Sequence, residues 1–509
     1  SIRVALGAGR AQILRLLLAE SFLLAVAGAA AGLVLAVVTD RLVLGLLPPD
    51  LASMNLKAGP DFRVFLFATA IATLTVLLVG LLPAGTTRAD AAPALKEQAG
   101  TASPPHTRFR KVLVGAQVAL SVLLLVQAGL FARSLMNLRD LGTGFPIENL
   151  VVFNLNPPHA GYDAKRTFAF FEQLTDDLRA VPGVREVGLA NMAIILGNEW
   201  DSGVTVEGHL PKPGEEPSPY MNAIGPGYFA TLGVPVVAGR DFTRQDTDEL
   251  KHGPEDDDWV PRVVMVNEKF ARQFFGDSAS ALGRHVGFGS DPGTPTDMEI
   301  VGVVRDIKYT SLRDEIPIQM FVPYLASRRA GNMNVYLRAQ GAPESLIATA
   351  RERVRRLDPN VPLYAIRTME QRVTDSLLIE RLVAGLSTVF GFVAALLACV
   401  GLYGVMAYGV ARRTREIGVR MALGAFEKDV VWLVLKEVVV LVAVGVAVGL
   451  PAALGLSRWV RSQLFGVSFA DPLTLALVTS SLAAAAGLAG YLPARRASRI
   501  DPLKALRHD

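Results

Sequence analysis

The sequence has little charge and almost no cysteine. Cys399 is the only thiol in 509 residues, so no disulfide can form within the chain. Asp, Glu, Lys and Arg make up 19% of the residues, hydrophobic types make up 51%, and the mean hydropathy is +0.35. Soluble domains typically carry about 25% charged residues. The composition therefore favours a membrane protein, in which any part outside the membrane is held by its own core.

Six stretches contain no Asp, Glu, Lys or Arg at all. An α-helix rises about 1.5 Å per residue, so roughly 20 apolar residues cross a hydrocarbon layer of ~30 Å. The stretches are 21–39, 64–87, 112–132, 382–411, 438–457 and 472–494. A buried core helix can mimic one such stretch but not six, and we predict a polytopic α-helical membrane protein with six transmembrane helices.

Lys and Arg are concentrated in every second segment that flanks these apolar stretches. Basic clusters lie before the first, between the second and third, between the fourth and fifth, and after the sixth. The positive-inside rule places these clusters in the cytoplasm, so the long segment 133–381 faces outward. The formal net charge of +4 is thus carried by residues at the membrane edge, and no basic stripe interleaved with aromatic residues indicates a nucleic-acid partner.

The outward segment has the pattern of a large α/β extracytoplasmic domain of two subdomains. Residues 150–156 and 185–190 are strand-like and flank a helical pattern at 163–180, and a similar strand–helix–strand pattern begins at 334–340 and 343–357. These two units predict a small two-layer subdomain beside the membrane. The short strands and turns of residues 200–330 predict a second subdomain farther away.

Motifs for chemistry are nearly absent from the sequence. The six histidines are scattered, and the acidic run 254–259 lacks the spacing of a calcium loop, so we expect no metal and no cofactor. No G-x-x-x-x-G-K-[ST] motif occurs, so we expect no ATP hydrolysis by this chain. An ectoenzyme is the least favoured class, because no nucleophile–base constellation is visible.

A segment near the start of the chain repeats near its end. The matching positions are Arg3, Leu6, Gly7, Ala8, Glu20, Gly28 and Gly32 against Arg420, Leu423, Gly424, Ala425, Glu437, Gly445 and Gly449. The two glutamates are predicted to mark the cytoplasmic membrane face, with a charge of no specific role as an equal alternative. The G-x-x-x-G pairs Gly28/Gly32 and Gly445/Gly449 are predicted to allow close helix packing.

The sequence also carries motifs of a known family. "RRTREIGVRMALGA" and "PARRASRIDPLKALR" resemble the permease domain shared by MacB, lipoprotein-release permeases and FtsX, and "PGYFATLGVPVVAGRDF" and "IVGVVRDIKY" resemble the MacB-like periplasmic core domain. The doubled permease ending is most similar to duplicated orphan permeases that lack a fused ATPase. The expected domains are 1–96 (end of a first FtsX-like permease domain), 97–111 (cytoplasmic linker), 112–132 (transmembrane helix), 133–381 (periplasmic core domain) and 382–509 (second permease domain). The repeat offset then predicts that roughly 300 residues precede Ser1 in the full-length chain.

This resemblance implies the membrane subunit of an ABC-type complex, most simply an exporter, that is driven through mechanotransmission by a cytoplasmic ATPase supplied in trans. The alternative is an FtsX-like signalling device that regulates an envelope partner. The residues implied at the ATPase contact are Arg415, Glu416, Arg420, Leu423, Gly424 and Ala425, with Arg3, Leu6, Gly7 and Ala8 in the first copy. A reading in which these arginines only satisfy the positive-inside rule stays open. The resemblance further implies a bacterial cytoplasmic membrane location, contact with membrane lipid, a periplasmic adaptor as a further candidate partner, and two fused permease halves that form a pseudo-dimer.

Overall fold

The computed structural model describes residues 10–46, 62–85, 105–209, 216–248, 261–291, 293–324 and 331–499. The chain divides into two compact units. The helical unit comprises Ser1–Met136 and Glu380–Asp509, and the sheet unit comprises Asn137–Ile379.

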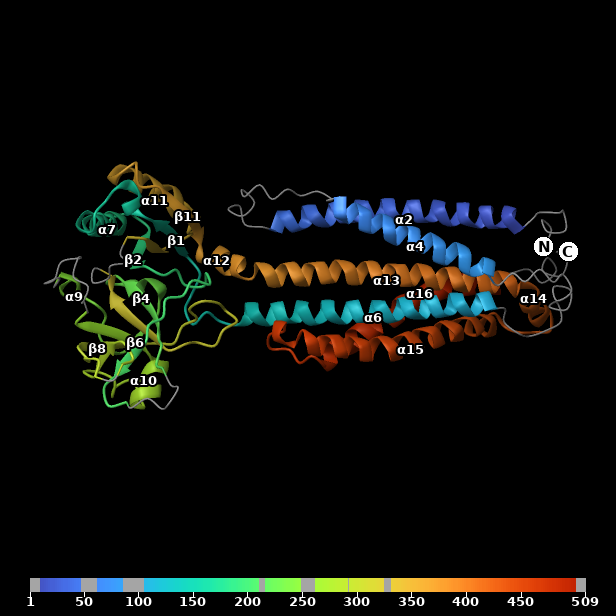
Figure 1. Cartoon of the computed structure of the whole chain (residues 1–509). Coiled ribbons are helices and arrows are strands. Elements are labelled where there is room, and N and C mark those ends of the chain that lie inside the picture. Colours follow the sequence, from blue (N-terminus) through green and yellow to red (C-terminus); the bar gives the residue numbers. More distant parts are fainter. Residues whose placement is uncertain are drawn as a thin grey trace. The chain divides into compact units, whose positions relative to one another are not determined.

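Long helices make up the helical unit (Figure 1). They are α2 (Arg10–Leu46), α4 (Phe62–Gly85), α6 (Pro105–Asp140), α13 (Leu378–Arg412), α15 (Glu427–Trp459) and α16 (Pro472–Ser498), with the short α14 (Thr414–Ala422) between α13 and α15 and the 3-10 turn η4 (Arg461–Gln463) after α15. Both α6 and α13 continue for a few residues into the sheet unit.

One stripe of α6 forms the centre of the helical unit. Val118, Val122, Val126 and Leu130 recur every four residues, so they share one helix face, and all four are fully buried. They belong to a cluster with apolar residues of α13, α15 and α16, including Ala398, Leu402, Val438, Ala453 and Ala486. Small residues are frequent on the facing helices, and they allow the close helix contacts that packing in lipid requires.

The outer surface of these helices is apolar as well. Exposed large side chains include Phe392 and Val400 of α13, Val444 and Val448 of α15, and Leu488 of α16. A soluble bundle places charged residues at such positions, whereas a lipid-facing surface is apolar. Within the described residues, five helices are long and apolar enough to cross a membrane. The multi-pass prediction holds, but the predicted count of six is not confirmed, because the continuous part of α4 with described side chains covers only Phe62–Leu74.

In the part of the sheet unit that the structure describes, eleven strands form one hydrogen-bonded sheet. The strands are β1 (Leu150–Leu155), β2 (Val184–Ala190), β3 (Val204–Val206), β4 (Tyr220–Ile224), β5 (Val236–Gly239), β6 (Val263–Asn267), β7 (His285–Phe288), β8 (Met298–Val304), β9 (Gln319–Pro323), β10 (Met333–Ala339) and β11 (Leu363–Thr368). The helices are η2 (Pro157–Ala160), α7 (Ala164–Arg179), α8 (Tyr228–Leu232), α9 (Gln245–Asp248), α10 (Glu268–Phe275), α11 (Glu344–Leu357) and α12 (Met369–Ser376). The strand order is β11-β1-β10-β2-β4-β9-β6-β8-β7-β3, and β5 pairs with β8.

The two predicted strand–helix–strand units interlock at one end of this sheet. β10 lies between β1 and β2 and pairs antiparallel with both, while β1 lies between β10 and β11. The result is a split β-α-β arrangement, covered by α7 and α11, which lie side by side (Figure 1). Phe171, Leu174 and Leu178 of α7 recur at helical spacing, and all three are buried against the sheet.

The remaining strands extend the same sheet. Ala190 of β2 pairs with Ile224 of β4, and this antiparallel contact joins the split β-α-β part to the strands from residues 200–330. One hydrophobic cluster includes residues from both parts, such as Phe171 and Val266. The predicted division into two subdomains is therefore not confirmed, because backbone pairing and the core continue across the boundary.

A candidate partner-docking segment

Residues 413–426 form a compact helical reversal between α13 and α15. The α14 helix ends at a glycine: the Gly424 and Ala425 amides donate to the carbonyls of Met421 and Arg420, at 3.1 and 3.0 Å. Gly424 has a φ of +98°, a value that side chains disfavour. The next helix then begins at once, because the Asp429 carboxylate accepts the Phe426 amide at 3.1 Å. The local sequence therefore fixes a short helix followed by a tight turn.

One face of α14 is anchored on the helical unit. Ile417 is 2% exposed and packs in a small cluster with Val430 of α15 and Ala497 of α16. Arg413, the residue before α14, donates to the Glu437 carboxylate at 2.8 Å, and Lys111 of α6 donates to the other oxygen of Glu437 at 3.0 Å. The base of α14 is thus tied to α6 and α15 by apolar packing and by two ion pairs.

The opposite face of this segment is exposed and partly apolar. Leu423 is 82% exposed and Phe426 is 77% exposed, although both are large apolar residues. Beside them, the half-exposed Glu416 and Arg420 form an ion pair of 2.6 Å one turn apart on α14. Exposed apolar residues rimmed by charges are typical of a surface that another molecule covers. We call Glu416, Arg420, Leu423 and Phe426 the α14 tip.

Two further contacts hold basic side chains near the base of α14. The Arg110 guanidinium lies 4.6 Å from the centre of the Tyr408 ring, and Arg496 of α16 donates to the Tyr403 hydroxyl at 2.8 Å. These residues come from α6, α13 and α16, so basic side chains that follow the positive-inside pattern also join neighbouring helices. The sequence offered no direct signal for these pairs, since their partners are far apart along the chain.

The structure places the residues predicted for partner contact as follows. Glu416 and Arg420 lie on α14, Leu423 caps it, and Gly424 and Ala425 form the turn. Arg415 also lies on α14, but its side chain is outside the described residues, as are Arg3, Leu6, Gly7 and Ala8 altogether. Phe426 was not predicted from the sequence, although a search for aromatic residues beside the repeat could have found it. The ion pairs of Glu437 were not predicted either.

The glycines predicted for helix packing have different surroundings in the two copies. A Cβ on Gly445 would lie 2.4 Å from Val118 Cγ1, and a Cβ on Gly449 would lie 2.5 Å from the Ala119 carbonyl oxygen, so α15 approaches α6 closely there. Around Gly28 and Gly32 no described atom lies within 4 Å of that position. The packing function of the first pair remains a prediction.

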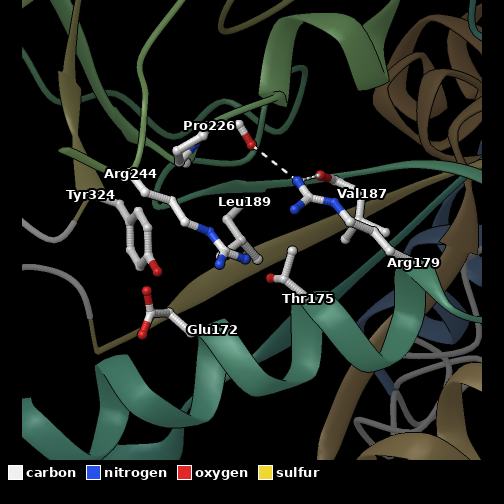
Figure 2. A pocket seen from close by; sticks show the side chains of 9 residues that line it. Glu172, Thr175, Arg179, Val187, Leu189, Pro226, Arg244 and Tyr324 are labelled. Carbon is white, nitrogen blue, oxygen red and sulfur yellow. Dashed lines mark hydrogen bonds between the residues drawn. The ribbon is translucent and has the colours of Figure 1, made fainter. Parts of the chain in front are cut away.

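A small pocket in the sheet unit lies between α7 and β2 (Figure 2). Arg179 of α7 donates to the carbonyl oxygens of Val187 and Pro226 at 3.4 Å each, and Arg244 pairs with Asp176 at 2.7 Å. The cavity measures about 40 Å³, which is room for little more than a water molecule. Both arginines are engaged by the protein, so this pocket is structural. Within the described residues, no group of three His, Cys, Asp or Glu side chains is placed to hold a metal ion.

The chain matches two known protein families. Residues 1–89 and 388–502 match the FtsX-like permease C-terminal family, and residues 118–357 match the MacB-like periplasmic core domain. The chain is 27% identical over 312 residues to the uncharacterized ABC transporter permease YknZ of Bacillus subtilis (strain 168). This match covers 58% of this chain and 71% of that protein.

Other relatives are fused ATP-binding/permease proteins. The macrolide export protein MacB of Chromobacterium violaceum is 29% identical over 366 residues, and the pyoverdine export protein PvdT of Pseudomonas entomophila is 27% identical over 304 residues. The matches cover 64% and 56% of this chain but only 53% and 42% of those relatives.

Two solved structures also resemble parts of the chain. The periplasmic region of MacB from Actinobacillus actinomycetemcomitans is 16% identical with a TM-score of 0.29, and the match covers 47% of this chain and 95% of that structure. The extracellular domain of YknZ is 20% identical with a TM-score of 0.27, and the match covers 42% of this chain and 100% of that structure.

Proposed function

The chain belongs to the MacB/FtsX-like ABC transporter permease family, and from this premise we propose that it is the membrane subunit of an export complex driven by a separate ATPase. Relatives named as export proteins include a macrolide and a pyoverdine transporter, which supports export as the class of activity. The phosphate-binding motif G-x-x-x-x-G-K-[ST] does not occur in these 509 residues, so the proposal assigns ATP hydrolysis to a partner.

The observation that carries this proposal is the α14 tip. Leu423 and Phe426 present exposed apolar surface that a partner can bury, and the adjacent Glu416 and Arg420 supply charges that select the partner's orientation. Lys111 and several arginines close to this base are the residues that the positive-inside rule places in the cytoplasm. We propose that the cytoplasmic ATPase docks on this tip, and that Arg415, Gly424 and Ala425 belong to the same contact.

Force from such a partner has a defined route. The tip is tied through Ile417 and Arg413 to α15 and α16, and Glu437 extends the link to α6 through Lys111. The helices α6 and α13 have 36 and 35 residues, which corresponds to about 50 Å of helix each. Both belong to the chain segments that lead into the sheet unit, and we propose that a displacement at the tip is passed along these helices. This is the proposed mechanotransmission.

The same reasoning sets the proposed location. With the basic ends in the cytoplasm, the helical unit spans the bacterial inner membrane and the sheet unit lies in the periplasm, where a periplasmic adaptor is a candidate partner. The first FtsX-like match, residues 1–89, would form a second permease half beside residues 388–502. The proposed boundaries of the remaining parts are 97–111, 112–132, 133–381 and 382–509, as the sequence indicates.

Site-specific photo-crosslinking in living cells tests the docking proposal. A photoreactive residue at position 423 should capture a protein that contains an ATP-binding phosphate loop, and ATP hydrolysis by that protein should rise when this chain is present. The matched control is position 459, because Trp459 is 89% exposed at the other end of α15. Capture of the ATPase from position 459 but not 423, or only lipid adducts at 423, would refute the proposal.

Export and signalling differ in their outputs. If the chain is instead a signalling device, the crosslink at position 423 persists, but deleting the gene changes the activity of an envelope enzyme and leaves the export of small molecules intact. Accumulation measurements with a panel of dyes and macrolides in deletion and complemented strains separate the two functions.

A further inference from the structure

A larger cavity lies wholly within the sheet unit. It measures about 660 Å³, within the range of roughly 300–1,000 Å³ that is typical of small-molecule sites. Its walls come from Asn154 of β1, Asn334 of β10, Tyr364 of β11, Arg372 of α12 and the loop 191–199 that follows β2. These elements are distant in sequence and meet because of the interlocked strand order.

Asparagine amides form one wall of this cavity. The Asn334 amide donates to the Asn191 carbonyl at 2.9 Å, and the Asn191 amide donates to the Asn332 carbonyl at 2.8 Å. Asn154 lies next to them, with its amide nitrogen 3.5 Å from the side-chain oxygen of Asn334. Side-chain amides offer both donors and acceptors, and these hydrogen bonds, two of them to backbone carbonyls, hold the amides in fixed orientations. Such a wall suits a ligand that itself carries amide groups.

Backbone strain is concentrated around the same cavity. Among the described residues, three non-glycine residues have a positive φ, and two of them, Ile195 at +59° and Ala365 at +49°, border or line it. A β-branched residue rarely adopts this conformation, and the Ile195 amide is held there by the Tyr309 carbonyl at 2.6 Å. Ala365 lies where the β1–β11 register shifts, so a bulge sets the orientation of Tyr364. Strain of this kind persists where it positions functional groups.

Arg372 is a buried cation at the cavity wall. The residue is 3% exposed, and its Nη1 atom has no hydrogen-bond partner among the described residues. The charged and titratable groups facing it are the hydroxyls of Tyr228 and Tyr336, the Arg367 guanidinium and the Asp375 carboxylate, and Asp375 is paired with Arg367. Burial lowers the pKa of Arg372, yet a guanidinium stays protonated at any physiological pH. Among the described residues Arg372 forms no ion pair of its own, since the nearby Asp375 carboxylate is paired with Arg367. A buried cation in this situation is costly, and an anionic ligand would offset that cost.

We propose that this cavity binds a short peptide with free ends, whose carboxylate pairs with Arg372 and whose amides bind the asparagine wall. Arginine recognises carboxylates by paired hydrogen bonds, which gives the ligand one orientation. Glu199, held by the Tyr220 hydroxyl at 3.0 Å, lies on the same lining and supplies a negative group for the peptide ammonium. The two opposite charges on one cavity favour a zwitterionic ligand over a simple organic acid.

Titration calorimetry on the purified full chain in detergent tests this assignment, with trialanine as the probe and its carboxamide as the matched ligand. Trialanine should bind saturably, and removing its carboxylate should weaken binding by about tenfold or more, which equals about 1.4 kcal/mol. The substitution R372Q should produce the same loss, whereas R244Q, at an arginine of the small pocket that is already paired with Asp176, should leave the affinity unchanged. Equal binding of both ligands, or no saturable binding of trialanine, overturns the proposal.

The comparison of trialanine with its carboxamide on the unchanged protein tests the carboxylate contact even if R372Q misfolds, and a second variant tests the bulge. The substitution A365G relieves the positive φ at the bulge without removing a side chain that binds, so the protein should become no less stable while trialanine binding weakens several-fold. If A365G binds trialanine as well as the wild type does, the bulge does not position Tyr364 for the ligand, and that step of the proposal is overturned. Neither measurement involves an ATPase, so these results are independent of the docking at the α14 tip.

Discussion

The Arg413 guanidinium and the Glu437 carboxylate lie 2.8 Å apart and join the start of α14 to the first third of the neighbouring α15. Lys111 of α6 completes a three-residue ion cluster through the second oxygen of Glu437. The side chains are partly buried, so the pairs are less screened than those on an open surface. The cluster is therefore well placed to keep α14 in a fixed orientation when a partner pushes on its tip.

The substitution Glu437→Gln should uncouple the tip while preserving the partner's binding. Loss of both ion pairs should lower the free energy of unfolding by about 1 kcal/mol, while ATP hydrolysis by the bound partner loses its stimulation. Thermal unfolding in detergent and ATPase assays measure the two effects. The control Glu416→Gln breaks only the exposed pair with Arg420 and should cost about 0.3–0.5 kcal/mol. Unchanged stimulation in Glu437→Gln would show that the cluster is not part of the transmission route.

The substitution Arg420→Glu should abolish docking without affecting membrane insertion. It replaces the ion pair with Glu416 by a like-charge pair on the exposed face, away from the buried Ile417. If the ATPase presents an acidic surface to Arg420, the new glutamate meets a charge of the same sign, and such a contact can cost several kcal/mol of binding free energy. Co-purification of the ATPase should therefore be lost. The same reversal at Arg499, just after α16, is the control and should have a smaller effect. If Arg420→Glu fails to insert but still binds, Arg420 serves topology alone.

Much of the sheet unit could be predicted from periodicity alone. The helix expected at 163–180 is Ala164–Arg179, and the strand expected at 150–156 is Leu150–Leu155. Apolar spacing is a local property, so these elements could be read from the sequence. The strand order β11-β1-β10-β2 and the joining pair Ala190–Ile224 could not, because pairing between distant strands depends on tertiary packing.

The candidate sites divide in the same way. Glu416, Arg420 and Leu423 could be selected because the repeat and the family motif mark a contiguous segment. Arg372 and Asn154 meet at one cavity although 218 positions separate them, and neither stands in a recognisable motif. Glu437 was predicted as a marker of the membrane face, and its pairing with Lys111 became visible only when α6 was packed against α15.

The two copies of the G-x-x-x-G motif give a matched pair of substitutions. Gly449→Ala would bring a Cβ within 2.5 Å of the Ala119 carbonyl oxygen, so α6 and α15 must separate. Overpacking of this kind typically costs about 1–3 kcal/mol, and the melting temperature in detergent should fall accordingly. Gly28→Ala meets no described atom within 4 Å and should be neutral or slightly stabilising, because alanine is the better helix former. Equal effects at both positions would contradict the close approach at Gly449.

A last prediction concerns the start of α16, where Asp471 links two helices. Its carboxylate accepts the Thr474 hydroxyl at 2.6 Å and the Thr474 amide at 2.9 Å, and it also pairs with Arg133 of α6. The Thr474 hydroxyl, followed by its amide and by Arg133, holds the pKa of Asp471 below the ordinary value of 3.8, although burial opposes this shift. The ionised carboxylate therefore stabilises the folded state at neutral pH.

Because the folded-state pKa is the lower one, this stabilisation is complete well above pH 3.8, begins to fall as the pH approaches that value and is lost as the pH falls through the folded-state value. Asp471→Asn keeps a good helix cap but removes the charge, so the variant should melt below the wild type at neutral pH. The difference should shrink steadily between about pH 5 and pH 3 in detergent melts. Arg133→Gln should add little in the Asp471→Asn background, since its partner is already neutral. A gap that stays constant with pH would mean that the charge of Asp471 does not stabilise the helix junction.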